Sequence, residues 1–387
     1  MARYIFRELV IDSRTGLNPR KNFTLGNGNN YYITIKDIHD GKIVITDKTD
    51  RVDDDAIAII KKRSRIKNGD ILFTSIGRIG ETAIVTDKDD TWDVNESVFI
   101  FTLNTDLITQ EFFCALFQSK NVQDQLTRDS SGSTFKSIKM NQLEKMSFDI
   151  PSLEEQKKIS NVLRETNKLI SLRKEQLAKL DRLVKSRFIE LFGDPVYNND
   201  GLPTKKLREL GSLDRGRSQH RPRNDPKLLN GPYPLIQTGE VASAGLYITE
   251  YKNTYSELGL QQSKMWKSGT LCITIAANIA QTAILTFDAC FPDSVVGFVP
   301  DDAVSAIYMH YWFGFFQKIL EEQAPQVAQK NINLKILSDL DVMVPKKEHQ
   351  EQFAAFVEQT DKSKLAIQKS LDKLELLKKS LMQQYFG

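Results

Sequence analysis

Residues 153–193 constrain the fold of this chain most strongly, because its last forty or so residues repeat them without a gap. Setting Pro151 on Pro345 also aligns Gln156 with Gln350 and the Phe-Gly pair at 192–193 with the pair at 386–387. Apolar residues recur in both segments at the three- and four-residue spacing of a coiled-coil seam. The sequence therefore predicts two long amphipathic helices. Each must bury its apolar stripe, and the nearest equivalent surface is the other helix.

The segments that precede these helices also repeat each other. KNGDILFT at 67–74 returns as KSGTLCIT at 267–274, and residues 135–151 return as 329–345. Short apolar runs bounded by turn residues alternate with a helical pattern in each copy, which indicates mixed domains of strands and helices. We refer to residues 1–151 as head 1 and to residues 194–344 as head 2.

We therefore expect an α+β fold with pseudo-twofold symmetry. Two similar mixed α/β heads are separated by an antiparallel pair of long coiled-coil helices that act as a stiff spacer. The predicted segments are residues 1–151, 152–193, 194–344 and 345–387.

Composition excludes several classes of protein. No apolar run approaches the length of a membrane span or a signal peptide, so we expect a cytoplasmic protein. The three cysteines are widely spaced, which favours core packing over disulfides, and neither they nor the four histidines suggest a metal site. The net charge of +3 is mild, so any contact with nucleic acid must come from a local basic surface.

One such surface is predicted in the polar loop at 212–225. It carries Arg215, Arg217, Gln219, Arg221 and Arg223. The corresponding part of head 1 is less basic and carries Arg14, Arg20 and Lys21. Arginine and glutamine suit hydrogen bonds to base edges, and lysine suits phosphates. The alternative is a solvated loop without a ligand.

Two further pairs of loops are candidates for DNA contact. Arg78 lies in a turn between two predicted strands, and Asn278 and Gln281 lie in the matching turn of head 2. A second polar loop in head 1 carries Ser131, Ser133 and Lys136, and its counterpart in head 2 carries Gln329 and Lys330. Turns of small polar residues are also common as purely structural features, so both interpretations stay open here.

Catalysis has little support in the sequence. The Asp/Asn-Pro-Pro-Tyr/Phe loop of an adenine methyltransferase is missing, and no glycine pattern completes a nucleotide-binding motif. No nucleophile and base can be paired. We therefore expect a binding protein without catalytic residues or a bound metal.

Several segments together resemble the specificity subunit of type I restriction–modification systems. They are NGDILFTSIGRIGETAIV (68–85), IPSLEEQKKI (150–159), LFGD (191–194), GPYPLIQTGEV (231–241) and VPKKEHQEQF (344–353). The resemblance spans essentially the whole chain. The sequence departs from the family's pattern at two places. In head 2, IAANIAQ stands in place of IGRIGE, and the second helix opens with Lys-Glu-His-Gln.

The resemblance implies that this chain recognises DNA and that other subunits carry out the chemistry. Each head would recognise one half of a split, asymmetric site on double-stranded DNA, and the helices would set the spacing between the halves. They would also dock two modification subunits, which bind S-adenosylmethionine and methylate adenine. Restriction subunits would join them and use ATP and Mg, while this chain would bind no cofactor.

Two other functions are compatible with the residues alone. The chain could be a coiled-coil adaptor whose heads bind proteins rather than DNA. It could also be an enzyme that acts alone, which the missing motifs argue against.

Overall fold

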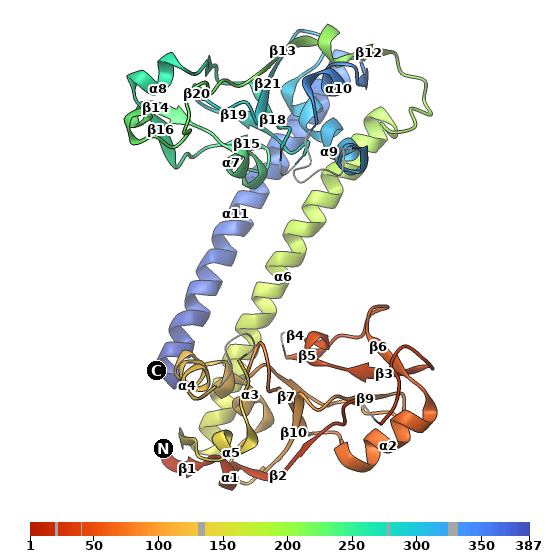
Figure 1. Cartoon of the computed structure of the whole chain (residues 1–387), viewed down its shortest axis with the longest axis vertical. Helices are drawn as coiled ribbons and strands as arrows, with labels where there is room; N and C mark the ends of the chain where they lie inside the picture. Colours follow the sequence, from red (N-terminus) through yellow and green to blue (C-terminus); the bar gives the residue numbers. More distant parts are fainter. Residues whose placement is uncertain (20–21, 40, 131–135, 277–278, 324–331) are drawn as a thin grey trace. The chain divides into compact units, whose positions relative to one another are not determined.

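The computed structural model of the chain describes residues 1–19, 22–39, 41–130, 136–276, 279–323 and 332–387 (Figure 1). It divides into two compact units. Unit 1 comprises Met1–Lys174 and Lys369–Gly387, and unit 2 comprises Glu175–Gln368. Each unit therefore contains one head together with part of each long helix. Among the described residues, no helix is both long and apolar enough to cross a membrane.

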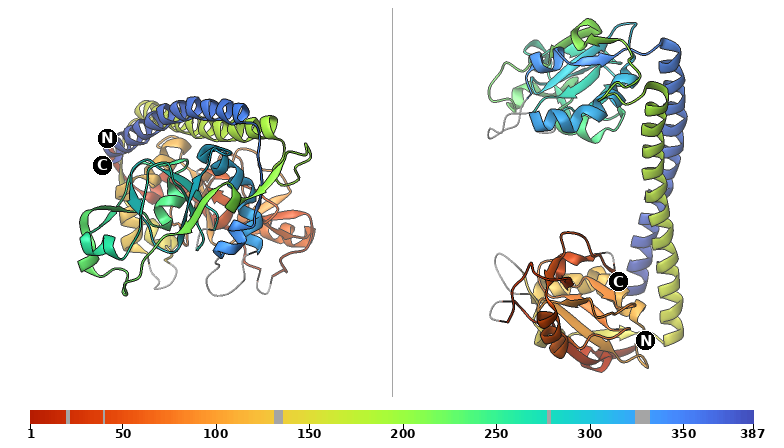
Figure 2. Two further views of the ribbon diagram at one scale, coloured as in Figure 1. Left: turned by 90° about the horizontal axis from the view of Figure 1, so that it is seen from above. Right: turned by 90° about the vertical axis from the view of Figure 1, so that its right-hand side faces the viewer.

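The two predicted helices are present as α6 (Leu153–Phe192) and α11 (Lys347–Phe386), each 40 residues long. In unit 1 the first part of α6 lies beside the last part of α11, where Lys174 Nζ is 3.1 Å from Glu375 Oε1 (Figure 2). In unit 2 the last part of α6 lies beside the first part of α11, where Lys364 Nζ is 2.7 Å from Asp181 Oδ1. The helices are therefore antiparallel, as their sequences predict.

Head 1 is built on an antiparallel sheet in the order β2-β10-β7-β8. Phenylalanine side chains from the sheet and from helix α3 form its core; Phe73 and Phe117, for example, pack edge to face at 5.4 Å. The elements are β1 (Ala2–Ile5), α1 (Phe6–Leu9), β2 (Val10–Thr15), β3 (Asn30–Ile33), η1 (Ile35–Asp37), β4 (Ile38–His39), β5 (Lys42–Ile43), β6 (Asp50–Val52), α2 (Asp54–Ser64), β7 (Ile71–Thr74), β8 (Thr82–Ile84), β9 (Trp92–Val94), β10 (Val98–Leu103), α3 (Gln110–Gln118), α4 (Lys120–Asp129), α5 (Met140–Leu143) and β11 (Ser147–Ile150).

Head 2 repeats this sheet as β13-β21-β18-β19 and adds β15 at the edge beside β19. A second sheet, β16-β14-β20-β17, extends the head. The elements are β12 (Thr204–Lys206), η2 (Leu207–Glu209), β13 (Gly211–Arg215), η3 (Pro226–Leu228), β14 (Leu229–Leu235), α7 (Thr238–Ser243), β15 (Tyr247–Ile248), β16 (Asn253–Tyr255), α8 (Glu257–Gln261), β17 (Met265–Trp266), β18 (Leu271–Thr274), β19 (Thr282–Leu285), β20 (Ala289–Cys290), β21 (Val295–Pro300), α9 (Ala306–Gln323), α10 (Leu334–Ser338) and β22 (Asp341–Met343). The duplicated α+β architecture expected from the sequence is confirmed.

A buried glutamine joins each head to the helix that follows it. Gln156 is completely buried near the start of α6. Its Oε1 accepts from the backbone N–H of Thr109 at 2.8 Å, and its Nε2 donates to the carbonyl oxygens of Leu107 and Pro151 at 2.8 and 3.0 Å. A buried amide with three backbone partners fixes a helix at a defined position, because each partner would otherwise be left without a hydrogen bond.

Head 2 contains the same arrangement around Gln350. Its Oε1 accepts from the N–H of Ser305 at 2.9 Å, and its Nε2 donates to the carbonyl oxygens of Ala303 and Pro345 at 2.9 and 3.0 Å. The repeated contacts place the first turn of α11 on head 2 as the first turn of α6 is placed on head 1.

In each unit, the last turn of a long helix packs against the head. In unit 1, Phe386 of α11 packs on Phe112 of α3 with ring centroids 5.3 Å apart. In unit 2, Phe192 of α6 packs on Tyr308 of α9 at 5.0 Å. Each head therefore buries the start of one long helix and the end of the other.

Candidate nucleic-acid interface

The arginine-rich loop of head 2 leaves the edge strand β13 through a glycine that cannot carry a side chain. The backbone N–H of Gly216 donates to Val295 O at 2.8 Å. A Cβ atom at Gly216 would lie 2.3 Å from the carbonyl oxygens of both Phe291 and Pro292, closer than any real Cβ contact. The loop is thus held tightly against the connection between β20 and β21 from its first residue.

Three of the predicted residues project from this anchored segment. Arg215 at the end of β13, Arg217 and Gln219 are exposed to solvent. The backbone N–H of Arg217 donates to Phe291 O at 3.1 Å, and that of Gln219 donates to Gln262 Oε1 at 2.8 Å. The backbone is fixed while the side chains remain accessible, which is the geometry that recognition of a ligand requires.

Arg221 and Arg223 share one carboxylate. An Nη2 atom of Arg223 donates to Asp293 Oδ1 at 2.6 Å, and Nη2 of Arg221 is 3.8 Å from Asp293 Oδ2. Both arginine side chains stay about half exposed. Asp293 therefore orders the pair and also offsets part of its positive charge.

The end of the loop is stabilised by Asp225. Its carboxylate accepts from the backbone N–H of Lys227 at 3.0 Å and lies 3.0 Å from His220 Nε2. These hydrogen bonds lower the pKa of Asp225, with the Lys227 bond contributing most. Asp225 is thus the N-cap of η3. Among the described residues, no group of three His, Cys, Asp or Glu side chains could hold a metal ion.

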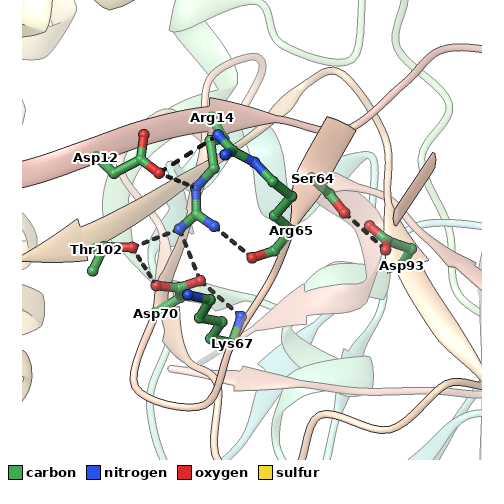
Figure 3. A network of polar contacts seen from close by, with 8 residues as sticks. All are labelled: Asp12, Arg14, Ser64, Arg65, Lys67, Asp70, Asp93 and Thr102. Atoms are coloured by element: carbon green, nitrogen blue, oxygen red, sulfur yellow. Dashed lines mark hydrogen bonds and ion pairs between the residues drawn. The ribbon is translucent and has the colours of Figure 1, made fainter. Parts of the chain in front are cut away.

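Arg14 does not face solvent, which corrects the prediction that it contacts DNA (Figure 3). Its side chain is 5% exposed, and Nη2 donates to Asp70 Oδ2 at 2.9 Å and to Thr102 Oγ1 at 2.5 Å. Nη1 donates to the carbonyl oxygen of Arg65 at 2.5 Å, and Nε lies 3.2 Å from Asp12 Oδ2. The guanidinium links β2, β7 and β10 to the end of α2 and is a structural group.

Two of the other predicted loops of head 1 lie side by side. The N–H of Gly77 donates to Lys136 O at 3.0 Å, so the turn that carries Arg78 contacts the segment that carries Lys136. Lys136 is exposed. Arg78 is also exposed, but its guanidinium contacts His39 Nδ1 at 2.8 Å and Glu81 Oε1 at 3.1 Å. Head 1 therefore presents here an exposed lysine, which forms no ion pair with any described residue, and a partly engaged arginine.

One contact of this region recurs in head 2. The N–H of Ile332 donates to Ile275 O at 3.0 Å, as that of Ile138 donates to Ser75 O at 2.9 Å in head 1. Gln281 is partly buried in the turn, and its N–H donates to Thr274 Oγ1 at 3.1 Å. The remaining predicted residues lie outside the described part of the chain: Arg20, Lys21, Ser131, Ser133, Asn278, Gln329 and Lys330.

Sequence reasoning missed the residues that position the arginine loop. Gln262, at the end of α8, accepts two backbone N–H groups of the loop, and Asp293 pairs with two of its arginines. Lys264 also lies close to this strand, 3.0 Å from Asp214 and 4.0 Å above the ring of Trp266. These partners are distant in sequence from the loop and carry no local motif, so no sequence signal could have identified them.

The geometry defines a protein with two duplicated heads, each closed by long antiparallel helices, and an anchored arginine-rich loop on one head. The sequence model of the family described as the type I restriction modification DNA specificity domain matches residues 9–182 and 199–378, once for each repeat. The chain therefore belongs to the type I restriction–modification DNA specificity family.

Individual relatives agree with this assignment. The chain is 24% identical over 371 residues to a putative type I restriction enzyme MjaX specificity subunit of Methanocaldococcus jannaschii, covering 91% of this chain and 85% of the relative. It is 29% identical over 212 residues to the type I restriction enzyme MjaIX specificity subunit of the same organism, covering 51% of this chain and 47% of the relative.

Two solved structures share the fold over the whole chain. One is the S subunit of a type I restriction–modification system from M. genitalium, with a TM-score of 0.60, 14% identity, and coverage of 100% of this chain and 96% of the other. The second comes from a study of complex assembly and conformational transition of the type I system, with a TM-score of 0.59, 18% identity, and coverage of 100% and 97%.

Proposed function

We propose that this chain selects the DNA sequence for a type I restriction–modification complex. Each head contacts one half of a bipartite, asymmetric site, and α6 with α11 sets the number of base pairs between the halves. The observation that carries the proposal is the loop of head 2, whose backbone is fixed at Gly216 and Gln262 while Arg215, Arg217 and Gln219 stay exposed.

The chemistry of these side chains suits direct recognition of bases. Arginine donates two parallel hydrogen bonds to guanine O6 and N7, and glutamine pairs with adenine N6 and N7. Arg221 and Arg223, which Asp293 holds, suit phosphate contacts that position the head. Because head 1 carries different residues at its loops, the two half-sites would differ in sequence.

The proposal assigns the chemical steps to partner subunits. Two modification subunits dock on the helices and methylate adenine with S-adenosylmethionine, and restriction subunits use ATP and Mg. This chain is non-catalytic and binds no cofactor. It acts in the cytoplasm, which is consistent with the free thiols of Cys114, Cys272 and Cys290.

The test uses the complex with its modification subunits and a duplex carrying the methylated site found by sequencing the host's modified bases. We expect Arg217→Ala to weaken binding to this duplex by about 1–3 kcal/mol and to relax the preference at one base pair. Arg223→Ala should weaken binding to all duplexes alike and reduce the salt slope by about 1. Arg208→Ala, which removes an exposed arginine paired with Asp339 on the same head, is the control.

The proposal fails if the assembled wild-type complex binds the methylated site and random duplex equally at every salt concentration. It also fails for head 2 if Arg217→Ala and Arg208→Ala bind DNA with the same affinity and base preference.

A further inference from the structure

Unit 1 contains a cavity that the architecture of the fold does not require. It has a volume of about 410 Å³ and lies between the start of α4, the middle of α6 and the last turns of α11. Its apolar wall is formed by Ile170, Met382 and Phe386. The remainder is polar and includes four lysines and one acidic residue: Lys120, Lys174, Lys378, Lys379 and Glu375.

The duplicated position in unit 2 is filled by the protein itself. At the offset that places Pro151 on Pro345, Lys378 corresponds to Val184 and Met382 to Phe188. Val184 and Phe188 are both completely buried. Helix α9 also continues past the point where α3 ends, and its Phe315 packs on Phe188 at 5.1 Å. A chain that fills this position in one copy with aromatic side chains could do so in the other, so the open lysine-lined version in unit 1 indicates a ligand.

The charges of the cavity define the chemistry of that ligand. Lys174 at its edge is paired with Glu375 at 3.1 Å. Within the described part of the chain, Lys120, Lys378 and Lys379 form no ion pair. Three unpaired ammonium groups around an apolar wall complement a ligand that carries both negative charge and an apolar group.

A protein segment fits these features better than DNA does. A phosphate backbone would satisfy the lysines but would leave uncovered the parts of Met382 and Phe386 that line the cavity. An aromatic or leucine side chain, flanked by aspartate or glutamate, would fill the hollow and pair with the lysines at the same time. The volume is suited to one or two such anchor side chains and their backbone.

We propose that this cavity binds an acidic segment of one modification subunit, with one large apolar side chain as its anchor. The proposal rests on the proposed function, which places modification subunits on α6 and α11. Because unit 2 fills the equivalent position, the chain offers this contact once. The two modification subunits are therefore held with unequal affinity, and the one next to unit 1 has the additional contact.

The main test places the side chains of the filled position in unit 2 at the equivalent cavity positions of unit 1. The double variant Lys378→Val with Met382→Phe fills the cavity with residues that the chain already uses at the duplicated position. Lys373→Val, an exposed lysine on the same helix, makes the same change in helix propensity away from the cavity. A second double variant, Lys378→Glu with Lys379→Glu, keeps the hollow open and reverses its charge.

Purified modification subunit is titrated into each full-length variant, and native mass spectrometry counts the subunits bound. For the wild type and Lys373→Val we expect two modification subunits. For both double variants we expect one binding step to weaken at least tenfold while the other is unchanged, so that the complex with one subunit accumulates.

Other outcomes would overturn the proposal. Two equally tight binding steps in the charge-reversed variant would show that the lysines bind no acidic segment, and this variant decides if the filled variant does not fold. An equal loss of affinity in both binding steps would show that the cavity does not serve only one of the two modification subunits. If the variants instead lose affinity for duplex DNA alone, the occupant is nucleic acid. A wild-type chain that binds no modification subunit would contradict the proposed function itself.

Discussion

The buried glutamine Gln350 gives the most decisive test of how a head is joined to a long helix. Its amide is 3% exposed and satisfies three backbone groups of head 2 and the preceding loop. Replacement by leucine retains a side chain of similar volume but removes every hydrogen bond. The change therefore isolates the polar contacts from the packing.

The magnitude follows from the groups left without partners. The N–H of Ser305 and the carbonyl oxygens of Ala303 and Pro345 would each lose a hydrogen bond in a buried setting. Each buried backbone group that is left without a hydrogen bond lowers the folding stability by about 1–3 kcal/mol. Because the loop at 303–305 can shift to admit water, and because leucine gains apolar burial, we expect Gln350→Leu to lower the free energy of unfolding of unit 2 by about 3–5 kcal/mol.

Urea denaturation followed by the fluorescence of Trp266 and Trp312, both buried in unit 2, measures this loss. Hydrogen exchange at the Ser305 amide should lose its protection at the same time. Gln352→Leu is the matched control, because Gln352 lies on the same helix two residues away and is exposed. A loss below about 1 kcal/mol, no larger than that of Gln352→Leu, would refute the role assigned to the amide.

Three further predictions concern other buried or constrained groups. Arg14→Ala should destabilise unit 1 by about 3–5 kcal/mol in urea denaturation, because Asp70 would keep a buried charge without its partner; Arg7→Ala, at an exposed ion pair, should cost less than about 1 kcal/mol. Burial lowers the pKa of His310 from 6.5 to about 4, so the unfolded chain binds a proton first as the pH falls. Between pH 6.5 and 4 the wild type should therefore lose about 3 kcal/mol more of the stability of unit 2 than His310→Gln does. Gly216→Ala should lower the DNA affinity of the assembled complex about tenfold in a titration because it displaces the arginine loop, whereas Gly239→Ala, which has open space around its Cβ position, should not.

The sequence was sufficient to predict the long helices and their antiparallel pairing. The offset that aligns Pro151 with Pro345 is constant over the whole of α6 and α11, and apolar periodicity is a local property. The duplicated heads were also predictable, because a repeat identifies equivalent elements without any knowledge of their contacts.

The candidate site was predictable only in part, as Arg14 and Arg217 illustrate. Both arginines occur at or just beyond the equivalent strands β2 and β13, and residue type and neighbours do not separate them. Their environments differ because of residues that are distant in sequence. The guanidinium of Arg14 is buried against Asp70, which lies 56 residues away. Gly216 and Phe291 fix the backbone at Arg217 and leave its side chain in solvent. Pairing across a sheet is non-local, so it is not visible in a short window of sequence.

The two copies differ where a ligand could distinguish them and agree where the scaffold needs the same contact. Gln156 and Gln350 make the same three hydrogen bonds in their own units. In contrast, Lys378 faces a cavity where Val184 is buried. A duplication under structural constraint alone would preserve apolar residues at buried helix positions, since a lysine there forfeits apolar burial and must keep its ammonium group solvated. If the cavity binds a modification subunit, exchanging Lys378 and Met382 for valine and phenylalanine should therefore stabilise unit 1 while it weakens assembly.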